Sequence, residues 1–180
     1  MLLSTSACVS FLNASRSEPI ATSEVDRSLG EKIDDRNIRT VIAVNIDKAD
    51  PELAKSPVNV HAFRGVVLLT GQVPSEKLRT LAETTARDVA RVREVHNELA
   101  ISNAQRFIEN LSDSALETKI DSKLLVAKGV RTSRVKVIVE DGTVYLLGLM
   151  TAEEAERVTE VISNTSGVTR LVRAIEYVEP

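Results

Sequence analysis

One β-hairpin pattern occurs twice in this sequence, and it constrains the fold more than any other feature. The second copy spans Val135 to Met150 and reads VKVIVEDGTVYLLGLM, with strand-forming residues on both sides of Asp141-Gly142. A turn dipeptide between two such runs is the strongest short-range signal for a hairpin. The first copy spans Val58 to Val73 and reads VNVHAFRGVVLLTGQV, so the chain predicts two equivalent hairpins.

Two glycine pairs set the alignment of the two copies. Gly65 aligns with Gly142 and Gly71 aligns with Gly148, and the members of both pairs are 77 residues apart. We predict all four glycines as turn residues that flank a strand. Self-similarity at this long period indicates a duplicated domain rather than a solenoid of short repeats.

The segment before each hairpin has the period of a helix. Residues 35–46 align with residues 113–124, and both place apolar side chains at i, i+4 and i+8, which is one face of a helix. These side chains are Ile38, Ile42 and Ile46 in the first copy and Leu116, Ile120 and Leu124 in the second. We predict that Asp34 or Asp35 caps the first helix, which ends near Pro51 because proline stops a helix.

The segment after each hairpin predicts a second helix and a third strand. Residues 75–89 align with residues 152–166 and are helical in period, while residues 92–99 align with residues 168–175 and alternate like strands. Each copy therefore has the order α-β-β-α-β. Two helices packed on one side of a small sheet give an α+β sandwich.

This ordered set of motifs resembles the BON domain. The first copy carries the resemblance in GVVLLTGQV (65–73) and VREVHNEL (92–99), and the second in VKVIVEDGTVYLLGLMT (135–151) and SGVTRLVRAIEY (166–177). Two such domains behind a lipidated cysteine resemble the dual-BON outer-membrane lipoproteins of Gram-negative bacteria, of the DolP type. The resemblance covers nearly the whole chain from about Asn13. It implies two tandem BON domains, each with two helices on one face of a three-stranded mixed sheet.

The first residues, MLLSTSAC, resemble the end of a lipoprotein signal peptide. Ser6 and Ala7 precede Cys8 as in a lipobox, although Thr5 stands where leucine is usual. A basic segment and an apolar run of about 7–15 residues do not fit before Cys8, so we expect the true start to lie upstream. The alternative is a free cysteine in a polar tail. In lipoproteins of this kind an aspartate after the cysteine favours the inner membrane, so Val9 favours the outer membrane.

These patterns divide the chain into five parts. We predict a signal-peptide remnant at 1–8, a polar tether at 9–33, BON domain 1 at 34–101, an interdomain segment at 102–111 and BON domain 2 at 112–180. The interdomain segment contains Phe107, Ile108 and Leu111, so we expect it to pack against one or both domains. The alternative is a short helix that continues into the second copy.

Composition excludes several classes of function. The net charge of −3 argues against general nucleic-acid binding, and one cysteine excludes an intrachain disulfide. His61 and His96 lie far apart in sequence, so we expect neither a metal centre nor another cofactor. No nucleophile motif or glycine-rich phosphate loop is present, and both histidines fit structural roles better than catalytic ones. We therefore expect a protein that is not an enzyme.

The first helix of the second copy has extra apolar residues beside a group of cations. Leu125 and Val126 replace Asp47 and Lys48 of the first copy. The nearby cations are Lys119, Lys123, Lys128, Arg131, Arg134 and Lys136. Apolar side chains beside cations suit a lipid headgroup layer, although the acidic residues Asp113, Glu117 and Asp121 of the same helix oppose this. The alternative is that Leu125 and Val126 form the contact between the two domains.

The resemblance favours the lipid site, because this helix is the one implied to bind anionic phospholipid in dual-BON lipoproteins. Carried over by position, the expected phospholipid-binding residues are Leu116, Lys119, Lys123, Leu125, Val126, Lys128 and Arg131. Ala115 stands where such proteins can carry an aromatic residue, so the contact is expected to be weaker or centred further along the helix.

The expected function is therefore that of an outer-membrane protein, lipid-anchored through Cys8 and facing the periplasm, which binds anionic phospholipid and supports outer-membrane integrity. Two alternatives stay open. One is an interaction adaptor that docks the outer-membrane protein assembly machinery. The other is a soluble periplasmic stress protein, in which Cys8 is never acylated.

Overall fold

The computed structural model describes residues 29–102, here called domain 1, and residues 111–179, here called domain 2. Domain 1 contains α1 (Leu29–Ala49), η1 (Leu53–Lys55), β1 (Val58–Phe63), β2 (Val66–Val73), α2 (Glu76–Arg87), β3 (Glu94–Asn97) and β4 (Ala100–Ile101). Domain 2 contains α3 (Leu111–Val126), η2 (Thr132–Arg134), β5 (Val135–Glu140), β6 (Thr143–Met150), α4 (Ala152–Ser163) and β7 (Arg170–Tyr177). The predicted α+β order is confirmed in both copies.

Each domain has a mixed sheet with a central strand. β2 pairs antiparallel with β1 and parallel with β3, and β6 pairs antiparallel with β5 and parallel with β7. The third strand of domain 1 is broken, because β4 also pairs with β2 after a two-residue gap. At the break, the Glu98 amide donates to the Leu69 carbonyl at 2.9 Å and the Leu99 amide donates to the Asn97 side chain at 3.3 Å. The predicted α+β fold with a mixed sheet is therefore found in both domains, and domain 1 adds the short strand β4.

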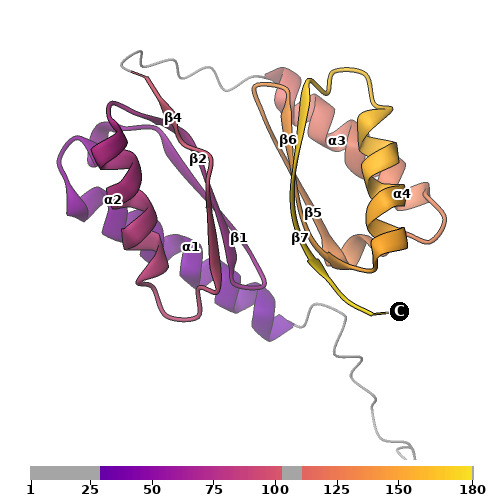
Figure 1. Cartoon of the computed structure of the whole chain (residues 1–180), viewed down its shortest axis with the longest axis horizontal. Helices are drawn as coiled ribbons and strands as arrows, with labels where there is room; N and C mark the ends of the chain where they lie inside the picture. The colour runs from indigo at the N-terminus through magenta and orange to yellow at the C-terminus, as the bar shows by residue number, and fades with distance from the viewer. Residues whose placement is uncertain (1–28, 103–110, 180) are drawn as a thin grey trace, which may run out of the picture.

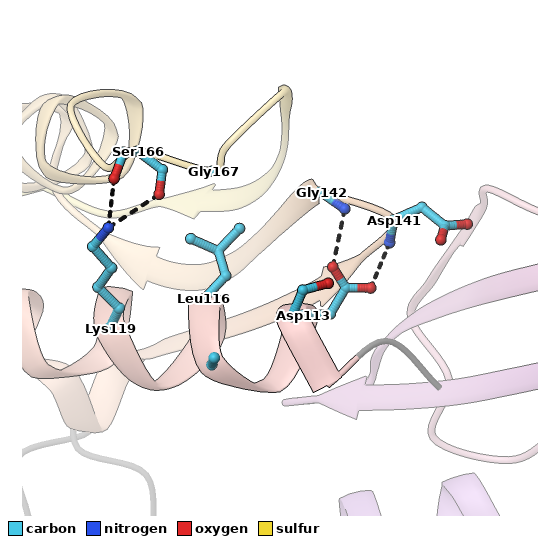
Figure 2. Close-up of a pocket in the computed structure, with 9 residues that line it drawn as sticks. Asp113, Leu116, Lys119, Asp141, Gly142, Ser166 and Gly167 are labelled. Carbon is cyan, nitrogen blue, oxygen red and sulfur yellow. Dashed lines mark hydrogen bonds between the residues drawn. The ribbon is translucent and has the colours of Figure 1, made fainter. Parts of the chain in front are cut away.

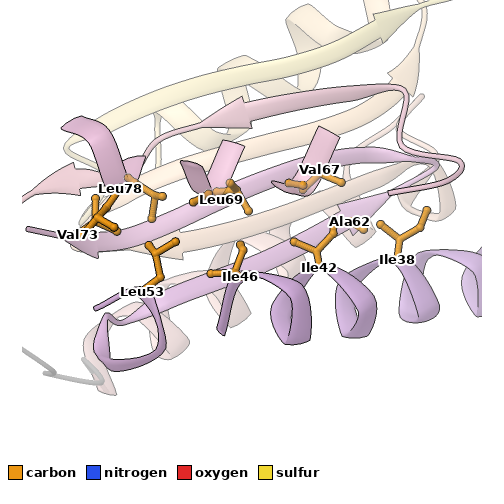
Figure 3. Packing of buried hydrophobic residues seen from close by; sticks show 12 residues of the cluster. Ile38, Ile42, Ile46, Leu53, Ala62, Val67, Leu69, Val73 and Leu78 are labelled. Carbon is orange, nitrogen blue, oxygen red and sulfur yellow. The ribbon is translucent and has the colours of Figure 1, made fainter. Parts of the chain in front are cut away.

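Both domains have aliphatic cores between the helices and one face of the sheet. Figure 3 shows Ile38, Ile42 and Ile46 of α1 directed at Val67 and Leu69 of β2. In domain 2, Leu116, Ile120 and Leu124 of α3 likewise belong to the buried core. The i, i+4, i+8 pattern therefore marks the buried face of each first helix, as predicted.

An aspartate on each first helix binds the turn of the neighbouring hairpin. Asp35 accepts hydrogen bonds from the backbone amides of Arg64 at 2.9 Å and Gly65 at 3.0 Å. Both turn residues have positive φ, 52° and 78°, as a type I′ turn requires. The predicted N-cap role of Asp34 or Asp35 is wrong, because α1 begins at Leu29 and the Asp35 carboxylate is buried against the turn.

Domain 2 repeats this arrangement. Asp113 of α3 accepts from the amides of Asp141 at 2.8 Å and Gly142 at 3.1 Å (Figure 2). Their φ angles are also positive, 49° and 71°. The conserved geometry within one chain identifies this helix-to-turn contact as a shared structural device of both copies, here called the turn lock.

Gly71 and Gly148 are not turn residues, which corrects the prediction for this second glycine pair. Both lie inside strands, because β2 continues to Val73 and β6 to Met150. A Cβ atom on Gly71 would lie 1.9 Å from the Pro57 carbonyl oxygen, and one on Gly148 would lie 2.9 Å from the Arg134 carbonyl oxygen. These glycines therefore allow close approach of the backbone that enters the first strand of each hairpin.

The two domains pack sheet against sheet, with the helices on the outside (Figure 1). The buried apolar residues of this contact are Phe63, Val66 and Leu68 of domain 1 and Ile138, Tyr145 and Leu147 of domain 2. Leu125 and Val126 take no part in this cluster and are exposed, so the alternative in which they join the domains is wrong.

Charged and polar pairs surround this apolar contact. Arg170 lies 2.9 Å from Glu98, and Arg93 pairs with Glu176 across the interface. The hydrogen bond to Glu176 raises the pKa of Arg93 above its ordinary value, although burial acts in the opposite direction. These pairs lie at the edge of the contact, where solvent weakens them.

Glu140 of β5 reaches across to domain 1. Its carboxylate accepts from Asn59 at 3.0 Å and from the Thr70 hydroxyl, and His61 lies 3.6 Å away. Burial alone raises the pKa of Glu140, but the contacts with His61, Thr70 and Asn59 outweigh it and hold the pKa below its ordinary value of 4.5. The charged form of Glu140 therefore stabilises the domain contact.

Three parts of the predicted organisation lie outside the described residues. These are the signal-peptide remnant with Cys8, most of the tether, and the interdomain residues Phe107 and Ile108. Leu111, the last residue of that segment, is the first residue of α3.

We predict that Asp113→Asn lowers the free energy of unfolding by about 1–3 kcal/mol, since the amide cannot accept from both turn amides and places its own NH₂ against one of them. Urea denaturation measures this loss. Asp121→Asn on the same helix is the matched control, because Asp121 binds no turn and its change is expected to stay within about 0.5 kcal/mol. Equal stability of the two variants would contradict the turn lock.

We predict a pH dependence centred on Glu140. A carboxyl with a lowered folded-state pKa contributes stability above its unfolded pKa and loses it as the pH falls through the folded value. The wild-type chain should therefore lose stability progressively below pH 4.5, while Glu140→Gln should begin about 1 kcal/mol less stable at neutral pH and lose less on acidification. Urea midpoints across this pH range, followed by tyrosine fluorescence, check this. Parallel curves for both proteins would refute it.

Candidate membrane-facing site on the first helix of domain 2

The C-terminal end of α3 exposes two adjacent aliphatic side chains. Leu125 is 73% exposed and Val126 is 80% exposed, more than any other large apolar side chain in the described ranges. Lys128 follows in the turn after the helix and is also exposed. Exposed aliphatic side chains of this size usually mark a contact with another molecule when they stand together. Leu125, Val126 and Lys128 are here called the α3 tip.

Two of the predicted lysines are committed to contacts within domain 2. The Lys119 ammonium donates to the Ser166 hydroxyl at 2.6 Å and to its carbonyl at 3.1 Å (Figure 2). The Lys123 ammonium donates to the Thr165 hydroxyl at 2.9 Å and to the Asn164 carbonyl at 3.4 Å. Cations at the end of a helix bind its last carbonyl groups and oppose the negative end of its dipole. Lys119 and Lys123 therefore hold the end of α4 against α3.

Leu116 and Arg131 also have structural surroundings. Leu116 is only 8% exposed and belongs to the core, where its side chain lies against Gly167. Glu154 at the start of α4 is buried, and it accepts from the Arg131 amide at 2.7 Å and from the guanidinium at 3.2 Å. The structure therefore brings Leu125, Val126 and Lys128 together at one surface and engages the other four expected residues in contacts within domain 2.

Two carboxylates of α3 are partly shielded from water. Burial raises the pKa of Glu117, and the nearby charge of Asp121 raises it further. Burial also raises the pKa of Asp121. Both groups therefore accept a proton more readily than ordinary carboxylates, and the helix becomes less negative as the pH falls.

Hollows lie at both ends of α3. A groove of ≈ 410 Å³ borders Leu125 and is lined by Asp121, Ser122, Thr132 and Val135 among others. A second hollow of ≈ 530 Å³ lies at the start of the helix, beside Asp113, Leu116 and Lys119 (Figure 2). The polar groups of the second hollow already bind one another through the turn lock and the Lys119 contacts. Of these two hollows, the groove beside Leu125 is therefore the one that adjoins exposed apolar side chains.

Neither histidine lies in a catalytic arrangement. His61 faces Glu140 at the domain contact, and His96 lies 3.2 Å from the exposed carboxylate of Glu94. Among residues 29–102 and 111–179, no group of three or more His, Cys, Asp or Glu side chains could hold a metal ion. No helix in the same part of the chain is both long enough and apolar enough to cross a bilayer.

The sequence pattern did not predict that Lys119 and Lys123 bind the end of α4. Lys119 and Lys123 are spaced i, i+4 and lie on the side of α3 that faces the end of α4. The aligned residues of the first copy are Val41 and Asn45, so the change of residue type was visible in the alignment of the two copies. Only the packing angle of α3 on α4 distinguishes an internal contact from a solvent-facing cation.

Comparison with known proteins gives matches over both domains. The model of the family described as "BON domain" matches residues 34–103 and 112–179. A protein of Haemophilus influenzae named outer membrane lipoprotein DolP is 35% identical over 153 residues, covering 85% of this chain and 79% of that protein. A 21 kDa hemolysin of Actinobacillus pleuropneumoniae is 34% identical over the same shares.

Among solved structures, the C-terminal domain of CdsD, a structural protein of the type III secretion system of Chlamydia trachomatis, gives a TM-score of 0.32 at 14% identity. The match covers 81% of this chain and 67% of that one. This likeness is too distant to add to the assignment.

Proposed function

Since the chain belongs to the BON-domain family, with two BON domains in tandem, we propose that it is a lipid-anchored protein of the outer membrane that binds anionic phospholipid through domain 2. It faces the periplasm, supports the integrity of the membrane and is not an enzyme. The name of the Haemophilus influenzae relative, an outer membrane lipoprotein, supports this location.

The observation that supports lipid binding is the exposure of Leu125 and Val126 beside Lys128. Aliphatic side chains of this size gain free energy by leaving water for the boundary between headgroups and acyl chains. A lysine at the same depth lies among the phosphates, where one cation contributes about 1 kcal/mol at an anionic surface. The proposed site is therefore the α3 tip, a smaller surface than the whole helix.

The two shielded carboxylates of α3 adapt this helix to an anionic surface. Such a surface attracts protons, and Glu117 and Asp121 already have raised pKa values. Protonation at the membrane removes negative charge that would otherwise repel the phosphates. Lys119 and Lys123 keep α3 and α4 together, so that the tip is presented on a rigid support.

We predict that Leu125→Glu/Val126→Glu lowers binding to anionic vesicles at least about tenfold, because it places two charges where apolar groups enter the lipid. Sedimentation with phosphatidylglycerol-containing and with neutral phosphatidylcholine vesicles, at low and high salt, measures this. Binding should be selective for the anionic vesicles and weaker at high salt. Circular dichroism should stay unchanged, since both side chains are exposed.

Two controls sharpen the vesicle experiment. Ile101→Glu changes an exposed aliphatic residue of β4 in domain 1 and should leave binding unchanged. Lys119→Ala removes a cation that is bound to Ser166 and should affect stability more than lipid binding. Full binding by the Leu125→Glu/Val126→Glu chain would place the lipid contact elsewhere. Binding to neither vesicle type would favour the adaptor that docks outer-membrane assembly machinery.

We further propose that Cys8 is the acylated residue. In a Gram-negative host, the chain behind a complete lipoprotein signal peptide should incorporate radiolabelled palmitate and fractionate with the outer membrane. Cys8→Ala should lose both properties, because the alanine side chain has no thiol to acylate. Equal palmitate labelling of the Cys8→Ala chain would exclude this anchor. A soluble periplasmic location of the unchanged chain would favour the stress-protein alternative.

A further inference from the structure

A second exposed apolar surface lies on α1 of domain 1. Ile33 is 60% exposed, Val41 45% and Val44 43%, while Ile38, Ile42 and Ile46 of the same helix are buried. At about 100° per residue, Val44 lies about 20° and Val41 about 80° around the helix from Ile33. The three exposed side chains therefore form one stripe on the side of α1 opposite the core, here called the α1 stripe.

Cations without partners accompany this stripe. Lys32, Arg36 and Lys48 are exposed, and none of their side chains has a hydrogen bond or ion pair to another residue of the described ranges. Lys48 lies within the stripe, and Arg36 and Lys32 follow along one flank at about 300° and 260° from Ile33. This differs from α3, where Lys119 and Lys123 are bound to the end of α4.

The acidic side chains of α1 are mostly neutralised by domain 1 itself. Glu31 pairs with Arg64 at 2.9 Å, and Asp34 pairs with Arg91. Asp35 is buried in the turn lock. Asp47, by contrast, is exposed and lies beside the stripe. The outward face of α1 therefore combines an apolar stripe with a net positive charge, which is the composition of a helix that lies on an anionic lipid surface.

The position of α1 in the chain favours a bilayer over a protein as its partner. Leu29, the first residue of α1, follows Cys8 by 21 residues, and a chain of this length spans at most about 70 Å even when fully extended. An anchored chain therefore keeps α1 at a high local concentration near the membrane. A groove of ≈ 540 Å³ beside Val41 would fit a peptide, but its lining includes the charged Asp34, Asp88 and Arg91.

We propose that the α1 stripe is a second membrane-contacting surface, specific for anionic lipid and separate from the α3 tip. The part of this inference that concerns the anchor rests on the proposed function. Figure 1 shows α1 and α3 in the outer layers on opposite sides of the paired sheets. The two surfaces therefore engage a flat bilayer in different orientations of the molecule, rather than together.

The test uses the unacylated full chain with phosphatidylcholine vesicles that do or do not contain phosphatidylglycerol. Val41→Glu/Val44→Glu should reduce sedimentation with anionic vesicles about tenfold. The matched control is Asn45→Glu/Ala49→Glu, which adds the same charge to exposed positions of the same helix away from the stripe and its cations and should cost about twofold. Equal losses in the two variants would overturn the proposal, since charge alone would then explain the effect.

A spectroscopic measurement locates the contact independently of affinity. The chain contains no tryptophan, so Val44→Trp provides a single reporter. Its emission should shift to the blue with anionic vesicles and be quenched by lipids brominated on their acyl chains. Unchanged emission with vesicles that sediment the protein would exclude the α1 stripe from the contact.

The two proposals fail separately in this design. If Leu125→Glu/Val126→Glu abolishes binding and Val41→Glu/Val44→Glu does not, the α3 tip stands and the α1 stripe is excluded. The reverse result excludes the α3 tip and supports the α1 stripe. Partial loss in each, with full loss in the combined variant, supports both. If the unchanged chain binds no vesicles, both membrane surfaces are excluded.

Discussion

A carboxylate of the first helix that binds two backbone amides of a hairpin turn connects the layers of each domain. Asp35 and Asp113 come from the helix layer, and the turns they bind belong to the sheets. The turn residues have positive φ, so the turn is costly for Arg64 and Asp141 without external support. The carboxylate provides that support and also sets the rotation of the helix about its axis. The core face and the outward face of α1 and α3 both follow from this rotation.

The second constraint is that each sheet is buried on both faces. One face packs on its own helices, and the other packs on the sheet of the neighbouring domain. Consecutive residues of β2 and β6 are therefore buried without alternation. This arrangement leaves the helices as the outer layers, so any surface that contacts a membrane is a helix surface or a loop.

The sequence predicted the parts of the fold that depend on local periodicity. The hairpins, the helix faces marked by Ile38 and Leu116, and the order of elements all follow from side-chain spacing and turn chemistry. The sequence does not reveal that α1 begins at Leu29. An aspartate such as Asp35 gives the same N-cap pattern whether its carboxylate binds an amide of its own helix or an amide of a distant turn. The contact between the domains was missed because a continuous apolar run in β6 does not reveal which face meets which partner.

The candidate site was predictable in part for a related reason. Leu125 and Val126 were identified by comparing the two copies, and they are indeed exposed. The direction of Lys119 and Lys123 depends on how α3 packs on α4, which no local pattern contains.

The contact between the sheets joins two faces that come from equivalent strands but differ in sequence. Leu68 and Tyr145 occupy equivalent places in β2 and β6, and both lie in the apolar contact. The other contact residues do not correspond in this way, because Phe63 aligns with Glu140, and Ile138 and Leu147 align with His61 and Thr70. Two identical copies of either domain would not reproduce this contact, since a symmetric dimer presents the same surface from both sides. Two linked copies can therefore carry different faces that complement each other, as Glu140 opposite Thr70 and His61 illustrates.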